Sequence, residues 1–128
     1  MTHTQTLMGG VLICVALASP VTAVDFVGRV VDEASGKLLP CRIYLQDAEG
    51  QWLFVKSASP QGSAVPYSEQ WVPMPESVDR HTTISAHPFQ VRVSPGTYRI
   101  TIERGKEYFP LTETLQIPDK ASSRTWRM

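Results

Sequence analysis

Apolar and polar residues alternate along most of the chain after residue 23, with the two-residue period of β-strands. Residues 41–46 place a cysteine, an isoleucine and a leucine on one face, and an arginine, a tyrosine and a glutamine on the other. No segment has the period of an amphipathic helix. The pattern predicts an all-β fold, an antiparallel β-sandwich of about seven strands. The predicted strands cover residues 25–32, 41–47, 52–57, 89–93, 97–103, 110–117 and 123–128.

Glycine and proline separate these segments. Ser35 and Gly36 predict a turn after the first strand. Residues 94–96, Ser-Pro-Gly, predict a tight turn that joins residues 89–93 and 97–103 as a β-hairpin. Residues 56–80 contain four prolines and interrupt the rhythm. This segment is predicted to be a long loop, and loops of this length inside a compact domain are either functional or poorly ordered.

The first 23 residues predict a secretory signal peptide. They contain no Lys, Arg, Asp or Glu, and an apolar run is followed by small residues that end at Ala23. We therefore expect a signal helix in residues 1–23, cleavage after Ala23, and a single domain in residues 24–128. The product would be secreted or periplasmic. The apolar run is too short for a transmembrane helix, which needs about 20 residues; an uncleaved membrane anchor is the alternative.

Charge and cysteine content narrow the function classes. Twelve basic residues balance twelve acidic ones, and no basic stripe is present, so no nucleic-acid partner is expected. Cys14 would leave with the signal peptide, which leaves Cys41 as the one cysteine and excludes an internal disulfide. Because Cys41 lies in an apolar alternation, we expect it in the core. An intermolecular or reactive thiol is the alternative.

Residues 26–47 contain a Gly28-x-Val30-x-Asp32 strand, a turn at Gly36, and Pro40 before an alternating strand. This segment resembles a carboxypeptidase-regulatory-like, transthyretin-like domain. Residues 81–89, 94–112 and 62–67 extend the likeness to the N-terminal β-sandwich of secreted CehA/McbA-like metallohydrolases. In those proteins the sandwich precedes a catalytic domain of the polymerase-and-histidinol-phosphatase (PHP) type. The resemblance covers residues 26–118.

The family's catalytic motif is absent from this sequence. The PHP domains carry metal ligands in D-x-H-x-H motifs, and no H-x-H occurs in this chain, which ends at about the point where such a domain would begin. The resemblance therefore implies an exported, non-catalytic accessory or interaction module that is not an enzyme and needs no cofactor. Its expected partners are a metallohydrolase catalytic domain or a glycan or protein of the cell envelope.

Two sets of residues are candidates for a site. The aromatic loop at residues 52–75 contains Trp52, Tyr67 and Trp71, which could stack on sugars and make the chain a carbohydrate or cell-wall binding module. Asp79, His81 and His87 could bind a metal if the chain folds back near residue 85, and the chain would then be a small metal-dependent hydrolase. Because His81 and His87 would be about 20 Å apart in an extended strand, we expect no metal site.

Residues 104–108, Arg-Gly-Lys-Glu-Tyr, are the most distinctive piece of the resemblance, and Glu103 precedes them. Their charged side chains could pair across a bend at Gly105. Tyr108 follows this bend, and we expect it to pack on the end of the sandwich and to hydrogen-bond the backbone, as tyrosine corners do. This segment is therefore predicted to have a structural role.

Overall fold

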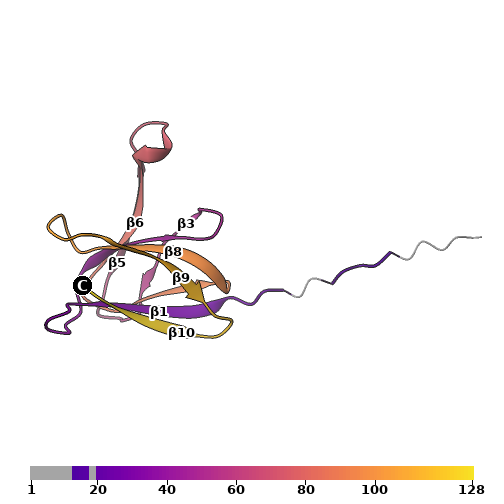
Figure 1. The fold of residues 1–128 in the computed structure, drawn as a ribbon, viewed down its shortest axis with the longest axis horizontal. Helices are drawn as coiled ribbons and strands as arrows, with labels where there is room; N and C mark the ends of the chain where they lie inside the picture. The colour runs from indigo at the N-terminus through magenta and orange to yellow at the C-terminus, as the bar shows by residue number, and fades with distance from the viewer. Residues whose placement is uncertain (1–12, 18–19) are drawn as a thin grey trace, which may run out of the picture.

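The structure, a computed structural model, describes residues 13–17 and 20–128. The protein is all-β and has two sheets (Figure 1). The predicted signal helix falls largely outside the described residues. Residues 13–17, which are described, are exposed and form neither helix nor strand. The first strand begins at Val24, directly after the predicted cleavage position. Within the described residues, no helix has the length and apolar character needed to span a bilayer.

The first sheet has four strands in the order β10-β1-β7-β4. The antiparallel prediction holds for most pairings, but β1 and β10 are parallel, with Phe26 opposite Ser122. Parallel neighbours require a long crossover connection, and here most of the chain lies between them. The strands span Val24–Val31 (β1), Lys56–Ser57 (β4), Phe89–Val93 (β7) and Ser122–Arg127 (β10).

The second sheet has six strands. Five follow the order β5-β6-β2-β8-β9, and β3 pairs with the end of β2 that β6 leaves open. Because β2 lies at the centre, its outward side chains have neighbours on both sides. The strands span Cys41–Gln46 (β2), Trp52–Leu53 (β3), Ala64–Gln70 (β5), Val78–Ile84 (β6), Gly96–Glu103 (β8) and Leu111–Ile117 (β9).

The hydrophobic core lies between the two sheets, and the alternation in the sequence identifies much of it. Every second residue of β2 and β8 is buried, including Ile43, Ile100 and Ile102, none of which is accessible to solvent. Trp126 of β10 packs edge-on against Phe26 and stacks on Phe89, with ring centroids 6.2 Å and 6.0 Å apart. These aromatic contacts join all three longer strands of the first sheet.

Cys41 belongs to this core, and only 6% of its surface is exposed. Burial raises the pKa of its thiol to about 12, so the reactive thiolate is scarce at neutral pH. We expect native Cys41 to react with a thiol reagent roughly a hundredfold more slowly than in the unfolded chain. Exposed Cys14 is the internal control in the full chain. Equal labelling of both cysteines in native protein would contradict a core role for Cys41.

The long loop predicted for residues 56–80 was wrong. This segment contains β4, β5, a 3₁₀ turn at Pro75–Ser77 and the start of β6, which brings the sandwich to ten strands instead of about seven. Pro66 made the segment look irregular, yet β5 is an edge strand, where the missing N–H of a proline is tolerated. The strand predicted over residues 52–57 is also split, because β3 and β4 belong to different sheets.

The prediction that residues 89–93 and 97–103 pair as a hairpin was wrong. Both strands and the turn are present, but β7 and β8 lie in different sheets. The chain crosses between layers at residues 94–96, where Gly96 has a φ of 151° that few other residues adopt. The Tyr98 hydroxyl donates to the Ser94 carbonyl at 2.6 Å and fastens this crossing. Tyr108, the expected corner residue, is instead half-exposed, and Arg104 lies over its ring.

Candidate functional site

The outer face of the six-stranded sheet carries a row of side chains that runs across four strands. Tyr67 of β5 pairs with His81 of β6, and Tyr44 of β2 pairs with Thr101 of β8. The register continues from β6 to β2, where Ile43 lies opposite Thr82, so that Tyr44 is the outward neighbour of His81. Alternation turns all four side chains away from the core. Aromatic and polar groups from distant parts of the sequence therefore meet on one face.

His81 is the most buried polar residue of this row, with 4% of its surface exposed. Its ring stacks on Tyr67 and leans on Tyr44, with ring centroids 5.0 Å and 5.1 Å apart. The Nδ1 atom lies 2.9 Å from the Asp79 carboxylate, which accepts its hydrogen bond. The Asp79 carboxylate and the rings of Tyr44 and Tyr67 thus hold the imidazole in place. His81 is therefore a structural support beside the site.

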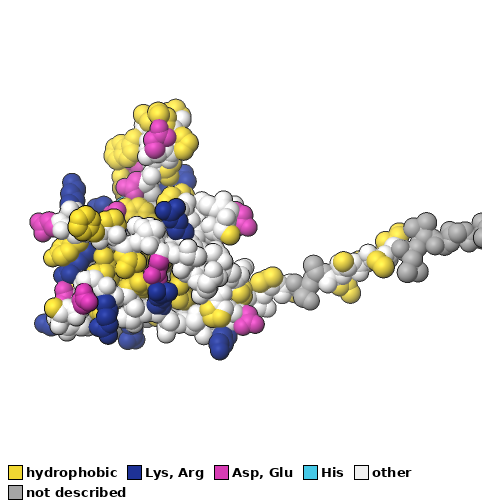
Figure 2. All heavy atoms as spheres, in the orientation of Figure 1, with side chains coloured by type: hydrophobic (Ala, Val, Ile, Leu, Met, Phe, Trp, Pro, Cys, Tyr) yellow, Lys and Arg dark blue, Asp and Glu magenta, His cyan; other side chains and the backbone are white. Residues whose placement is uncertain are grey.

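The β5–β6 hairpin extends beyond the sheet and stands away from the sandwich (Figure 1). Its tip, residues 71–77, is closed by Ser77, whose hydroxyl donates to the Met74 carbonyl at 2.8 Å. Hydrophobic side chains gather on this tip (Figure 2). Trp71, Val72 and Met74 are 70%, 48% and 49% exposed. Trp71 therefore stands in solvent at the side of the outer face.

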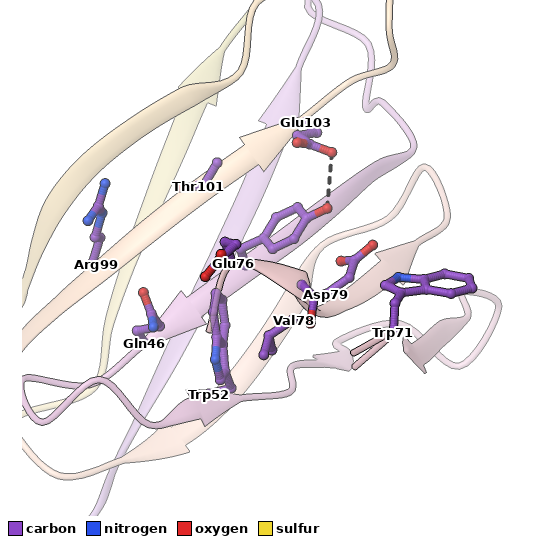
Figure 3. A pocket seen from close by; sticks show the side chains of 11 residues that line it. Gln46, Trp52, Trp71, Glu76, Val78, Asp79, Arg99, Thr101 and Glu103 are labelled. Atoms are coloured by element: carbon purple, nitrogen blue, oxygen red, sulfur yellow. Dashed lines mark hydrogen bonds between the residues drawn. The ribbon is translucent and has the colours of Figure 1, made fainter. Parts of the chain in front are cut away.

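A hollow of about 540 Å³ lies between the hairpin and the outer face. Figure 3 shows Trp52 of β3 and Trp71 of the hairpin tip bordering it, with Arg99 at the end far from Trp71. Three carboxylates share the lining with these aromatic groups. The lining residues are Tyr44, Gln46, Trp52, Trp71, Glu76, Ser77, Val78, Asp79, Arg99, Thr101 and Glu103.

Tyr44 lies at the centre of this lining. Its hydroxyl donates to Oε2 of Glu103 at 3.2 Å, and its ring meets Trp52 edge-on at 6.3 Å and an interplanar angle of 66°. Burial raises the pKa of Tyr44 to about 12, and the negative charges of Glu103 and Asp79 add to this rise. The phenol is therefore neutral at physiological pH, and the charged groups that act on it are the carboxylates of Glu103 and Asp79 and the guanidinium of Arg42.

The structure brings some of the predicted site residues together and separates others. Trp52 and Trp71 both line the hollow, whereas Tyr67 lies outside the lining and supports it through His81. Asp79 and His81 are bonded to each other, but His87 bonds to Ser85 Oγ at 2.8 Å instead of joining them. Residues 13–17 and 20–128 contain no group of three side chains suited to a metal ion.

Sequence reasoning missed Tyr44, Arg99 and Glu103 as site residues. The alternation of residues 41–46 and 97–103 had placed all three on polar faces. It contained no signal that β2 and β8 are neighbours, because 59 residues separate the bonded Tyr44 and Glu103. Finding these residues requires the order of the strands in the sheet, and the alternation within each strand does not contain it.

Comparison with protein-family models, with curated proteins and with solved structures found no match for this chain. The geometry of the outer face is therefore the basis on which its function is argued.

Proposed function

We propose that this chain is an exported, non-catalytic β-sandwich module that binds a glycan in the hollow on its outer face. The observation that carries this proposal is the joining of Trp52, Trp71 and Tyr44 with hydrogen-bonding side chains in one hollow of about 540 Å³. Ligand sites of proteins commonly have volumes of about 300–1,000 Å³. The resemblance to the leading domain of secreted metallohydrolases supports the accessory role and the export.

The aromatic residues suit the apolar faces of sugar rings. Trp52 comes from β3 and Tyr44 from β2, and both belong to the sheet, which holds them in place. Trp71 comes from the projecting hairpin and supplies an exposed indole at the other side of the hollow. Aromatic side chains provide a large contact area at a small cost in conformational entropy. They therefore suit a ligand that binds with one or two ring faces.

The polar side chains suit the hydroxyl groups of a sugar. Gln46 and Arg99 are cross-strand neighbours on β2 and β8, and both line the hollow beside Thr101. Amide, guanidinium and hydroxyl groups provide both donors and acceptors, and carboxylates add strong acceptors. A few convergent polar groups set in an aromatic site are what fixes the orientation of a small ligand.

A protein partner is the second candidate, and the apolar hairpin tip favours it. Val72 and Met74 are about half exposed and do not line the hollow, so a glycan in the hollow would leave them uncovered. Aromatic residues and methionine are enriched where proteins meet other proteins. A metallohydrolase catalytic domain, which the resemblance implies as a partner, is one protein that this tip could contact.

Titration with neutral oligosaccharides tests the glycan proposal. We expect tryptophan fluorescence to change on binding of cell-wall glycan fragments, because two of the three tryptophans line the hollow and Trp126 is buried. Trp52→Ala should weaken binding roughly tenfold or more, since it removes a central aromatic contact. The matched control is Phe109→Ala, at a 96% exposed residue outside the hollow.

The panel should include chitin, cellulose and xylan oligomers and peptidoglycan fragments, with calorimetry as a second readout. Binding that Trp52→Ala and Phe109→Ala weaken equally would place the ligand elsewhere. If neither fluorescence nor calorimetry detects any of these glycans, the proposal is refuted.

A further inference from the structure

We propose that the ligand of this hollow carries an ammonium group, which lies against the faces of Tyr44, Trp52 and Trp71. This inference rests on the proposed function, and it narrows the glycan to one that contains amino sugars with free amines. Two independent features lead to it, the arrangement of the aromatic rings and the charge of the lining.

Three aromatic rings border the hollow, and they do not lie in one plane. Tyr44 and Trp52 meet at 66°, so their faces are steeply inclined to each other and do not form one flat platform. Trp71 borders the hollow from the hairpin, as a third ring (Figure 3). Cations bind over aromatic faces because the ring quadrupole is negative there, and several rings together form the cages that recognise ammonium groups.

The charge of the lining also favours a cationic ligand. Glu76, Asp79 and Glu103 contribute three carboxylates, and Arg99 is the one Lys or Arg among the lining residues. Figure 3 places Arg99 at the end of the hollow far from Trp71. Arg42 lies outside the lining, opposite Glu103 on the neighbouring strand. Within the lining itself carboxylates outnumber cations by three to one, and a ligand with a positive charge would be drawn to them.

Glu76 and Glu103 form no ion pair among the described residues, although Arg42 is the cross-strand neighbour of Glu103. Glu103 accepts its hydrogen bond from the neutral phenol of Tyr44. Asp79 has only the His81 imidazole. The pKa of Tyr44 is raised first by burial and then by Glu103 and Asp79, and the side chain of Arg42 opposes part of this rise.

A neutral sugar would use the same rings without compensating this charge. Covering carboxylates with an uncharged ligand removes water from them and returns only neutral hydrogen bonds. An ammonium group offers charge-assisted hydrogen bonds to the carboxylates and a cation for the rings at the same time. The cationic sugar should therefore bind more tightly than its neutral counterpart of equal length.

Calorimetry with two matched ligands tests this inference on the full chain. The ligands are a glucosamine oligomer, with free amines protonated at mildly acidic pH, and the N-acetylglucosamine oligomer of the same length. We expect the glucosamine oligomer to bind at least about tenfold more tightly and to weaken as salt is added. Glu76→Gln combined with Glu103→Gln should abolish most of this preference while preserving the shape of both side chains.

Glu33→Gln is the matched control, because Glu33 is an exposed glutamate that does not line the hollow. It removes one negative charge and should leave the preference unchanged. Thermal melting of each variant establishes that the fold is retained. A preference that Glu33→Gln reduces as much as the double variant does would overturn the inference, because the effect would then follow net charge alone.

A third ligand, tetramethylammonium, separates this inference from the proposed function. Equal affinities for the two oligomers would overturn the ammonium inference and leave the glycan proposal standing. If neither oligomer binds but tetramethylammonium does, with the same dependence on Glu76 and Glu103, the site recognises ammonium and the amino-sugar inference fails. If none of the three ligands binds, the ammonium inference fails, and the glycan proposal fails with it when the whole glycan panel also shows no binding.

Discussion

Gly28→Ala is expected to lower the free energy of unfolding by about 3 kcal/mol, at the upper end of the usual cost of overpacking a core. Gly28 lies on β1, and a Cβ atom added there would fall on the Phe89 ring, within 2.6 Å of its Cε1 atom. Phe89 is 1% exposed and stacks on Trp126, so its ring has little room to move. Urea unfolding at an unchanged m-value measures the loss, and the melting temperature should fall by roughly 15 °C.

Gly36→Ala is the matched comparison for this variant. Gly36 has a φ of 70° and no atom within 4 Å of an added Cβ, so only backbone strain opposes alanine there. Its cost should be about 1 kcal/mol. Combining Gly28→Ala with Phe89→Leu should cost less than the sum of the two single changes, because the smaller side chain makes room for the methyl group. Equal losses at Gly28 and Gly36 would contradict the steric explanation.

Trp126→Ala is expected to cost about 4 kcal/mol, within the range for removing a large buried aromatic residue. Its ring is 3% exposed and contacts Phe26 and Phe89, and its indole N–H donates to Oε1 of Glu113 on the other sheet at 2.7 Å. Small domains are stable by about 5–15 kcal/mol, so much of this margin would be lost. The near-ultraviolet circular dichroism signal and urea unfolding would both report the change.

Trp126→Phe separates the packing from the hydrogen bond. Phenylalanine retains an aromatic ring in the core but leaves Glu113 with Arg124 as its remaining partner, an ion pair of 2.9 Å. We expect this variant to lose about 1–2 kcal/mol. Phe109→Ala, at an exposed aromatic residue, should change stability by less than about 0.5 kcal/mol. If Trp126→Ala is as mild as Phe109→Ala, β10 does not contribute to the core as described.

Two parts of the fold show what a local sequence pattern can predict and what it cannot. The core faces of β2 and β8 followed directly from the sequence, because every second side chain points into the same layer. The strand at β5 could not be found in this way. Its hairpin extends past the sandwich, so its two faces are not sorted into buried and exposed, and Pro66 concealed it further.

The candidate site shows the same division. Trp52 and Trp71 could be selected from the sequence because aromatic residues among prolines and turns are unusual in a solvated loop. Glu76 and Glu103 could not be selected, because a glutamate on a polar face is ordinary unless an aromatic ring lies beside it. That neighbour is provided by strands from other parts of the chain.

The sequence by itself determined the all-β class, most of the strands, the face that each turns to the core, and the burial of Cys41. These properties follow from a two-residue period, which depends only on neighbouring residues. Only the tertiary structure decided the strand order, the crossing between sheets at residues 94–96, the parallel β1–β10 pair and the hollow beneath the β5–β6 hairpin. Those depend on which faces pack together, and the packing free energy is shared among residues far apart in the chain.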